Sequence, residues 1–147
     1  MDVAVCSPSA TAEKAAAAGC ALCATPRELF ERSSHVVLQC ALTPETAGLV
    51  GADLIDAMPR EPCGRHLVNV ARGGIAVEAD VAAALASGAL DSYATDVFDD
   101  EPNCRETSPL FASPNLFSTP HVGAATREAQ DNVAVLIADR VMDVVGT

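Results

Sequence analysis

Short apolar runs alternate with helix-like segments along the sequence, and this alternation constrains the fold more than any other feature. We expect strands at residues 3–6, 20–23, 36–40, 65–70, 90–98 and 116–119. We expect helices at residues 11–18, 25–32, 52–58, 78–87 and 125–145. Because strands and helices alternate along most of the chain, the pattern predicts an α/β fold with a mostly parallel sheet.

Local signals mark several element boundaries within this pattern. Thr25 and Pro26, followed by Glu28, have the cap, proline and acid that are typical of a helix start. Gly88 is expected to end the helix at residues 78–87. Residues 99–114 contain three prolines and several charges, so we expect a surface loop there.

The charge balance limits the partners that the chain can bind. The formal net charge is -11, which argues against nucleic acid because binding to phosphates requires a basic face. The same charge argues against an anionic membrane surface, and no run is long enough to span a bilayer. An acidic protein that binds an acidic substrate needs a local positive group to hold it.

Six cysteines raise the question of redox or metal chemistry. Residues 20–23 form a C-x-x-C pattern, which suits a redox pair or half of a zinc site. The second pair that zinc would need is missing, so we expect no metal site. Buried, small apolar thiols are the default interpretation. Such usage fits a reducing, cytoplasmic compartment.

One motif contains a positively charged residue that could hold an acidic substrate. Residues 69–74 have the sequence Asn-Val-Ala-Arg-Gly-Gly and follow an apolar run. A buried strand that ends in a tight glycine turn would place Arg72 at the carboxyl edge of the sheet, where α/β folds bind ligands. The planar guanidinium can grip a carboxylate at two points. The alternative is that Arg72 only forms a salt bridge with a loop.

Two later motifs place an acid and a histidine at equivalent positions. Residues 96–102 have the sequence Asp-Val-Phe-Asp-Asp-Glu-Pro, and residues 118–124 have the sequence Ser-Thr-Pro-His-Val-Gly-Ala. Imidazole titrates near neutrality, so His121 could give and take a proton during reduction of a 2-oxo acid. An acid bonded to its other ring nitrogen would fix the tautomer. Arg72 would orient the substrate.

These three motifs, in this order, resemble the D-isomer-specific 2-hydroxyacid dehydrogenase family, in particular phosphoglycerate dehydrogenase and its glyoxylate- and hydroxypyruvate-reducing relatives. The resemblance extends over nearly the whole chain. It implies an NAD-dependent oxidoreductase, with NADP not excluded, that acts on the CH–OH group of D-2-hydroxy acids or reduces 2-oxo acids. It also implies that the catalytic residues are Arg72, Glu101 and His121, and family spacing selects Glu101 among the neighbouring acids.

The resemblance further implies a set of cofactor contacts. The expected residues are Ser7, Cys40, Thr46, Val70, Ala71, Arg72, Asp96, His121, Gly123 and Ala124. Asp96 matches the family residue that bonds the nicotinamide carboxamide. Ser7 stands where the family has an acid that contacts the ribose, so the choice between NAD and NADP stays open. Thr46 has two interpretations, a cofactor contact and an ordinary helix cap.

Two parts of the family pattern are absent, namely the G-x-G-x-x-G turn and the substrate-binding domain. We therefore expect residues 1–147 to form a partial dinucleotide-binding domain with a Rossmann-like, partial doubly wound sheet that lacks the first strand and the phosphate loop. The chain would act as a fragment of a full enzyme on a small 2-oxo or 2-hydroxy acid, and a homodimer is possible. The alternative is an inactive remnant that serves only as a binding or oligomerisation module.

Overall fold

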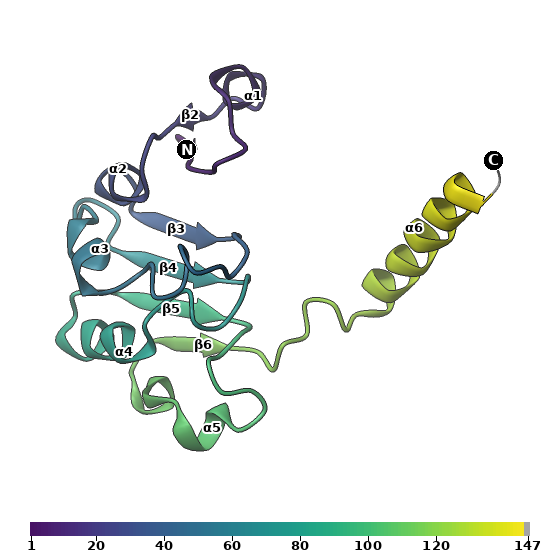
Figure 1. Cartoon of the computed structure of the whole chain (residues 1–147). Helices are drawn as coiled ribbons and strands as arrows, with labels where there is room; N and C mark the ends of the chain where they lie inside the picture. The colour runs from purple at the N-terminus through teal and green to yellow at the C-terminus, as the bar shows by residue number, and fades with distance from the viewer. Residues whose placement is uncertain (146–147) are drawn as a thin grey trace.

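Four parallel strands form the larger of two sheets in the computed structural model, which describes residues 1–145 (Figure 1). In chain order these strands are β3 (His35–Leu38), β4 (His66–Asn69), β5 (Ser92–Thr95) and β6 (Leu116–Ser118). They lie side by side in the same order, and all three pairings are parallel. The predicted α/β fold with a parallel sheet is confirmed.

A second, smaller sheet contains the remaining two strands. β1 (Ala4–Val5) and β2 (Ala21–Leu22) pair in parallel and are joined by helix α1 (Ala12–Ala17). Among the described residues, no strand pairing connects this sheet to β3, which is an edge strand. The predicted sheet is thus divided in two, because no described strand lies between the two parts.

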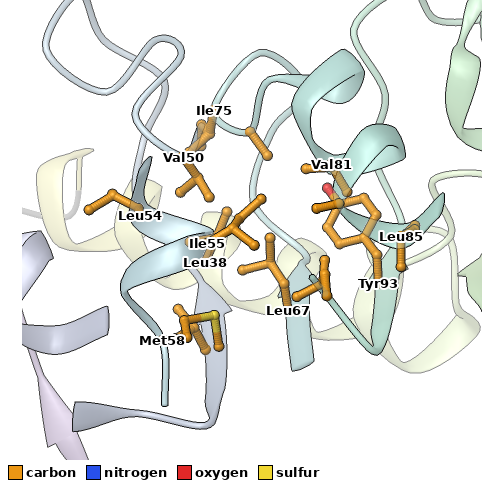
Figure 2. Close-up of a cluster of buried hydrophobic side chains, with 14 of the residues drawn as sticks. Leu38, Val50, Leu54, Ile55, Met58, Leu67, Ile75, Val81, Leu85 and Tyr93 are labelled. Atoms are coloured by element: carbon orange, nitrogen blue, oxygen red, sulfur yellow. The ribbon is translucent and has the colours of Figure 1, made fainter. Parts of the chain in front are cut away.

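Three helices cover one face of the larger sheet. They are α2 (Pro26–Arg32), α3 (Ala52–Ala57) and α4 (Glu78–Ser87). In β3, Val36 and Leu38 are buried, whereas Val37 is 53% exposed, so alternate side chains point toward the core and away from it. Figure 2 shows the resulting cluster, in which Leu67 packs among side chains from α3 and α4. Burial of each such side chain contributes about 1.5–3 kcal/mol.

The predicted helix boundaries have clear physical causes. Thr25 Oγ1 accepts from the Glu28 amide at 3.1 Å, and Glu28 Oε2 accepts from the Ala24 amide at 2.8 Å, so amides at the start of α2 are satisfied. Helix α4 ends at Gly88, which has a φ of 71°. Both predicted signals are confirmed.

The prediction of a surface loop at residues 99–114 is wrong in part. The segment contains helix α5 (Cys104–Thr107) and the 3-10 helix η1 (Pro109–Ala112). Leu110 of η1 is only 1% exposed and joins the core beside α4. Burial of Leu110 therefore anchors the segment to the core. This burial outweighs the local preference of the prolines for a loop.

Helix α6 (Arg127–Val145) extends away from the rest of the molecule (Figure 1). The predicted helix at residues 125–145 is confirmed, except that it begins at Arg127. Its apolar side chains, such as Leu136 at 64% and Ile137 at 59%, are exposed. Among the helices of the described part, none has the length and apolar character that crossing a membrane requires.

Candidate active site

The loops that follow β4, β5 and β6 meet at one edge of the sheet. These strands are adjacent and parallel, so their carboxyl ends lie side by side. The ladder continues into the loops, because the Asp96 amide donates to Asn69 O and the Thr119 amide donates to Thr95 O, both at 3.1 Å. The three sequence motifs therefore converge as predicted.

Asn69 shapes the turn that carries Arg72. Its side chain is 2% exposed, its Oδ1 accepts from the Ala71 amide at 3.1 Å, and its Nδ2 donates to Arg72 O at 2.9 Å. Arg72 Nη1 donates to Ala71 O at 2.7 Å. This role of Asn69 was not predicted, and the signal for it in the sequence is a polar residue directly after the apolar pair Leu67 and Val68.

Two glycines join the arginine loop to the acidic loop. A Cβ atom on Gly73 would lie 2.0 Å from Phe98 O, so only glycine allows this approach of two backbones. The next amide, of Gly74, donates to the Asp99 carboxylate. The loop of Arg72 is thus fixed against the loop that carries Glu101.

Glu101 and His121 form a direct pair. His121 Nδ1 donates to Glu101 Oε2 at 2.6 Å, and the other carboxylate oxygen accepts from the Phe98 amide at 2.7 Å. His121 has a φ of 54°, a left-handed backbone conformation that is uncommon for a non-glycine residue. No described residue hydrogen-bonds to its Nε2. The accessible ring nitrogen is therefore Nε2, on a side chain that is 46% exposed.

The surroundings of Glu101 favour its charged form. Burial alone would raise the pKa of this carboxyl, but the hydrogen bonds from His121 and the Phe98 amide lower it more. The net effect is a lowered pKa, so Glu101 is a carboxylate at neutral pH. A carboxylate at Nδ1 holds the ring in one orientation and favours a proton on that nitrogen.

Asp96 holds the turn that carries His121. Its carboxylate accepts from Thr119 Oγ1 and, at 2.9 Å each, from the amides of Val122 and Gly123. Burial would raise the pKa of Asp96, but these three hydrogen bonds outweigh burial and lower it. The structure therefore gives Asp96 a clear role as the anchor of the histidine turn.

Two hollows border the converging loops. One, of about 600 Å³, is lined by residues 39–42 and 70–72 and so contains Arg72 together with three predicted cofactor contacts, Cys40, Val70 and Ala71. The other, of about 430 Å³, lies beside Glu101 and His121. Among the described residues, no hydrogen bond or ion pair connects Arg72 with Glu101 or His121. The structure thus pairs the acid with the histidine and places the arginine in the neighbouring hollow.

The remaining predicted contacts are dispersed. Ser7 lies in the turn after β1, where its Oγ is 3.1 Å from Ser9 Oγ. Thr46 Oγ1 donates to Ala41 O at 2.6 Å and accepts from the Thr43 amide at 2.7 Å. The helix-cap interpretation of Thr46 is wrong, because the next helix is capped by Gly51 and Thr46 closes a turn before it. Ala124 O accepts from the side chain of Gln130.

Comparison with known proteins identifies the family of this chain. The family model of the D-isomer specific 2-hydroxyacid dehydrogenase NAD binding domain matches residues 1–123. The chain belongs to this family. The family resemblance predicted from the three motifs is therefore confirmed, and the match covers both sheets together with Arg72, Glu101 and His121.

Relatives within the 2-hydroxyacid dehydrogenase family are considerably longer than this chain. D-3-phosphoglycerate dehydrogenase of Dictyostelium discoideum is 34% identical over 129 residues, which are 86% of this chain and 31% of that protein. The Mycobacterium tuberculosis protein of the same name is 39% identical over 114 residues, which are 78% of this chain and 21% of that protein. The chain spans between a fifth and a third of these relatives.

Solved structures of family members share the fold. D-mandelate dehydrogenase of Rhodotorula graminis is 28% identical with a TM-score of 0.77, over 88% of this chain and 36% of that one. An NADPH-dependent glyoxylate/hydroxypyruvate reductase of Sinorhizobium meliloti is 30% identical with a TM-score of 0.73, over 87% of this chain and 41% of that one. The second structure was solved in complex with NADP and sulfate.

Proposed function

We propose that this chain is the catalytic part of the nucleotide-binding domain of an oxidoreductase that interconverts 2-oxo acids and D-2-hydroxy acids. The observation that carries the proposal is the Glu101–His121 pair at 2.6 Å, held at the edge of the sheet where the arginine loop also ends. Such a pair suits proton transfer to and from a substrate oxygen.

His121 is the proposed proton donor. Glu101 accepts from Nδ1, so the proton that reaches the substrate leaves from Nε2. In the reduction, the carbonyl carbon gains a hydride and the carbonyl oxygen gains this proton, which yields the hydroxy acid. In the reverse direction Nε2 takes the proton from the hydroxyl. Glu101 holds the ring through Nδ1 in both directions, because it is a carboxylate at neutral pH.

Arg72 is the proposed substrate anchor. One of its donors is used by Ala71 O, and the others remain for a carboxylate. The hydrogen bonds of Asn69 and the close approach of Gly73 to Phe98 fix the loop, so the backbone of Arg72 has a defined position relative to the acidic loop. From this position the guanidinium would hold the acid group while the carbonyl faces Nε2 of His121.

A nicotinamide dinucleotide, when bound, would supply the hydride. The hollow lined by residues 39–42 and 70–72 fits part of such a cofactor, because it opens at the carboxyl ends of β3 and β4 and presents both backbone and apolar groups. Cys40, Val70 and Ala71 would contact it there. Asp96 has lone pairs left beyond its three hydrogen bonds, and Ser7 would contact the ribose without excluding a phosphate. NAD and NADP are both consistent with these residues.

The domain organisation is part of the proposal. We infer that residues 1–147 are a partial dinucleotide-binding domain, and that the substrate-binding part is supplied by sequence outside it. The chain spans 31% and 21% of the two relatives compared above, which supports this inference. The phosphate-binding turn would enter beside the open edges of β1 and β3.

Catalysis can be tested in a chimera in which residues 1–123 replace the matching region of the Mycobacterium tuberculosis relative. Hydroxypyruvate and glyoxylate would be assayed with NADH and NADPH. We expect His121→Ala to lower kcat by about 10²–10⁴-fold, the usual contribution of general acid–base catalysis. We expect Arg72→Lys to raise KM and lower kcat, because an ammonium cannot form the two-point contact.

Matched controls separate catalysis from folding. His35→Ala removes an exposed histidine, and Arg27→Lys changes an exposed arginine, so both variants should keep normal turnover. The roles of Arg72 and His121 would be refuted if their variants also kept normal turnover. A folded chimera without turnover or cofactor binding would instead support the remnant interpretation.

A further inference from the structure

Three cysteines lie on the smaller sheet, and its register decides which of them are neighbours. Ala4 pairs with Ala21 and Val5 pairs with Leu22. The Cys23 amide donates to Val5 O at 2.8 Å, so the ladder continues one step beyond the strands. This step places Cys6 directly opposite Cys23.

The alternation of side chains puts these two thiols on one face. In a strand, residues two apart share a face, so Cys23 lies on the face of Ala21, opposite the face of Leu22. Cys20 directly precedes Ala21 and therefore lies on the opposite face, and its Sγ donates to Ala18 O at 3.5 Å. The C-x-x-C pattern therefore brings Cys20 close to Cys23 in sequence but not to the same face of the sheet.

The spacing of paired strands suits a covalent bond between the opposed cysteines. Neighbouring strands lie about 4.7–4.9 Å apart, and disulfides join Cα atoms that are about 4.4–6.8 Å apart. Cys6 is half-buried, whereas Cys23 is 3% exposed. Burial raises the pKa of the Cys6 thiol, and the charges of Cys23 and Glu28 raise it further, as expected for groups that face it closely.

We propose that Cys6 and Cys23 are a redox-sensitive pair that forms a disulfide across β1 and β2 when the protein meets a peroxide. The more accessible Cys6 attacks the peroxide through its thiolate form, which its raised pKa keeps a minor species at neutral pH, and the O–O bond breaks to give a sulfenic acid and hydroxide. Cys23 then attacks the Cys6 sulfur, and the S–O bond breaks as the S–S bond forms. Two thiols are oxidised, hydrogen peroxide is reduced to water, and the thiol protons end on that water. This pairing does not depend on the proposed enzyme activity.

Peptide mapping of the full chain tests the pairing. Trypsin cleaves after Lys14 and Arg27, so Cys6 lies in the peptide 1–14, and both Cys20 and Cys23 lie in the peptide 15–27. The reduced protein would be treated with hydrogen peroxide, alkylated in acid and digested. We expect a cross-linked pair of these peptides, with fragment ions that assign the bond to Cys23, and a rate of formation that rises with pH.

Single variants provide the controls. Cys20→Ser should form the cross-linked pair as fast as the wild-type chain, whereas Cys6→Ser should lose it. Circular dichroism would check that both variants fold, and the fragment ions of the wild-type chain decide the assignment if one does not. A peptide 15–27 that is lighter by two hydrogens, which indicates a Cys20–Cys23 disulfide, would overturn the proposal. So would oxidation to sulfinic or sulfonic acids without any cross-link.

Discussion

Replacing Gly73 with alanine tests how firmly the arginine loop is fixed to the acidic loop. The new Cβ would lie 2.0 Å from Phe98 O, 2.4 Å from Phe98 C and 2.9 Å from the Asp99 amide nitrogen. Ordinary contact begins near 3.4 Å, so one of the two backbones must move. All three atoms belong to the backbone, which prevents relief by rotation of a side chain. Overpacking costs about 1–3 kcal/mol and sometimes more, and we expect a value of about 3 kcal/mol or above here.

Gly88→Ala is the matched control for this substitution. Gly88 has a φ of 71°, but no atom lies within 4 Å of its added Cβ. Its cost is therefore limited to the left-handed backbone, which is about 1–2 kcal/mol for an L-residue. Equilibrium unfolding in urea, followed by circular dichroism, would measure both free energies of unfolding. If Gly73→Ala costs no more than Gly88→Ala, the close approach of the two loops is not present in solution.

A spectroscopic measurement would show whether the displacement reaches the Glu101–His121 pair. The Phe98 amide donates to Glu101, and Glu101 accepts from His121, so a shift of Phe98 should move the imidazole. We expect the nuclear magnetic resonance signals of His121 to change in Gly73→Ala and to stay unchanged in Gly88→Ala. Unchanged signals in both variants would mean that Phe98 does not couple the loops.

Two further predictions concern the carboxylates and the core. The folded-state pKa values of Asp96 and Glu101 are lowered, so their contribution to the free energy of unfolding should be fully retained above about pH 4 to 5 and should fall as the pH drops below that range. Unfolding at a series of pH values would measure this fall. A steeper loss in Asp96→Asn than in the wild-type chain would contradict the prediction. Leu67→Ala should lower the free energy of unfolding by about 2–5 kcal/mol, because Leu67 is 0% exposed. Val37→Ala, at a position that is 53% exposed, should change it by about 0.5 kcal/mol or less, and similar losses in the two variants would contradict the assigned core.

Periodicity predicted the main elements because it directly reflects burial. Val36 and Leu38 face the helices, and their apolar run was visible in the sequence. Helix boundaries were equally predictable, since the cap at Thr25 and the stop at Gly88 act through bonds to residues nearby in the chain. Features that local interactions decide can thus be inferred from the sequence alone.

The segment at residues 99–114 shows why the rest could not be predicted. Its helices α5 and η1 are short, and Leu110 is buried only because α4 lies beside it. For Leu110 the deciding partner is therefore distant in the sequence. Thr46 differs, because its hydroxyl binds backbone groups of its own turn, three and five residues away, and the residue pattern alone does not distinguish such a turn from a helix cap.

The candidate site also contains features that were predicted from the sequence and features that were not. The positions of Glu101 and His121 after neighbouring strands predicted that they would meet, and they do. The role of Gly73 was not predicted, because it depends on the Phe98 backbone, which only the folded chain brings close. The role of Asn69 was not predicted either, although its partners lie only two and three residues away. Sequence motifs identified the groups suited to the chemistry, and the structure identified those that position them.

The groups that position Arg72 and His121 all belong to this chain. Asn69 binds the arginine turn, Asp96 binds the histidine turn, and Glu101 binds both the Phe98 amide and the imidazole. None of these contacts involves a second domain. The Glu101–His121 pair is therefore formed before any substrate-binding part is added. In the proposed enzyme, a substrate-binding part would exclude water, while the loops after β4, β5 and β6 would hold the groups proposed for proton transfer.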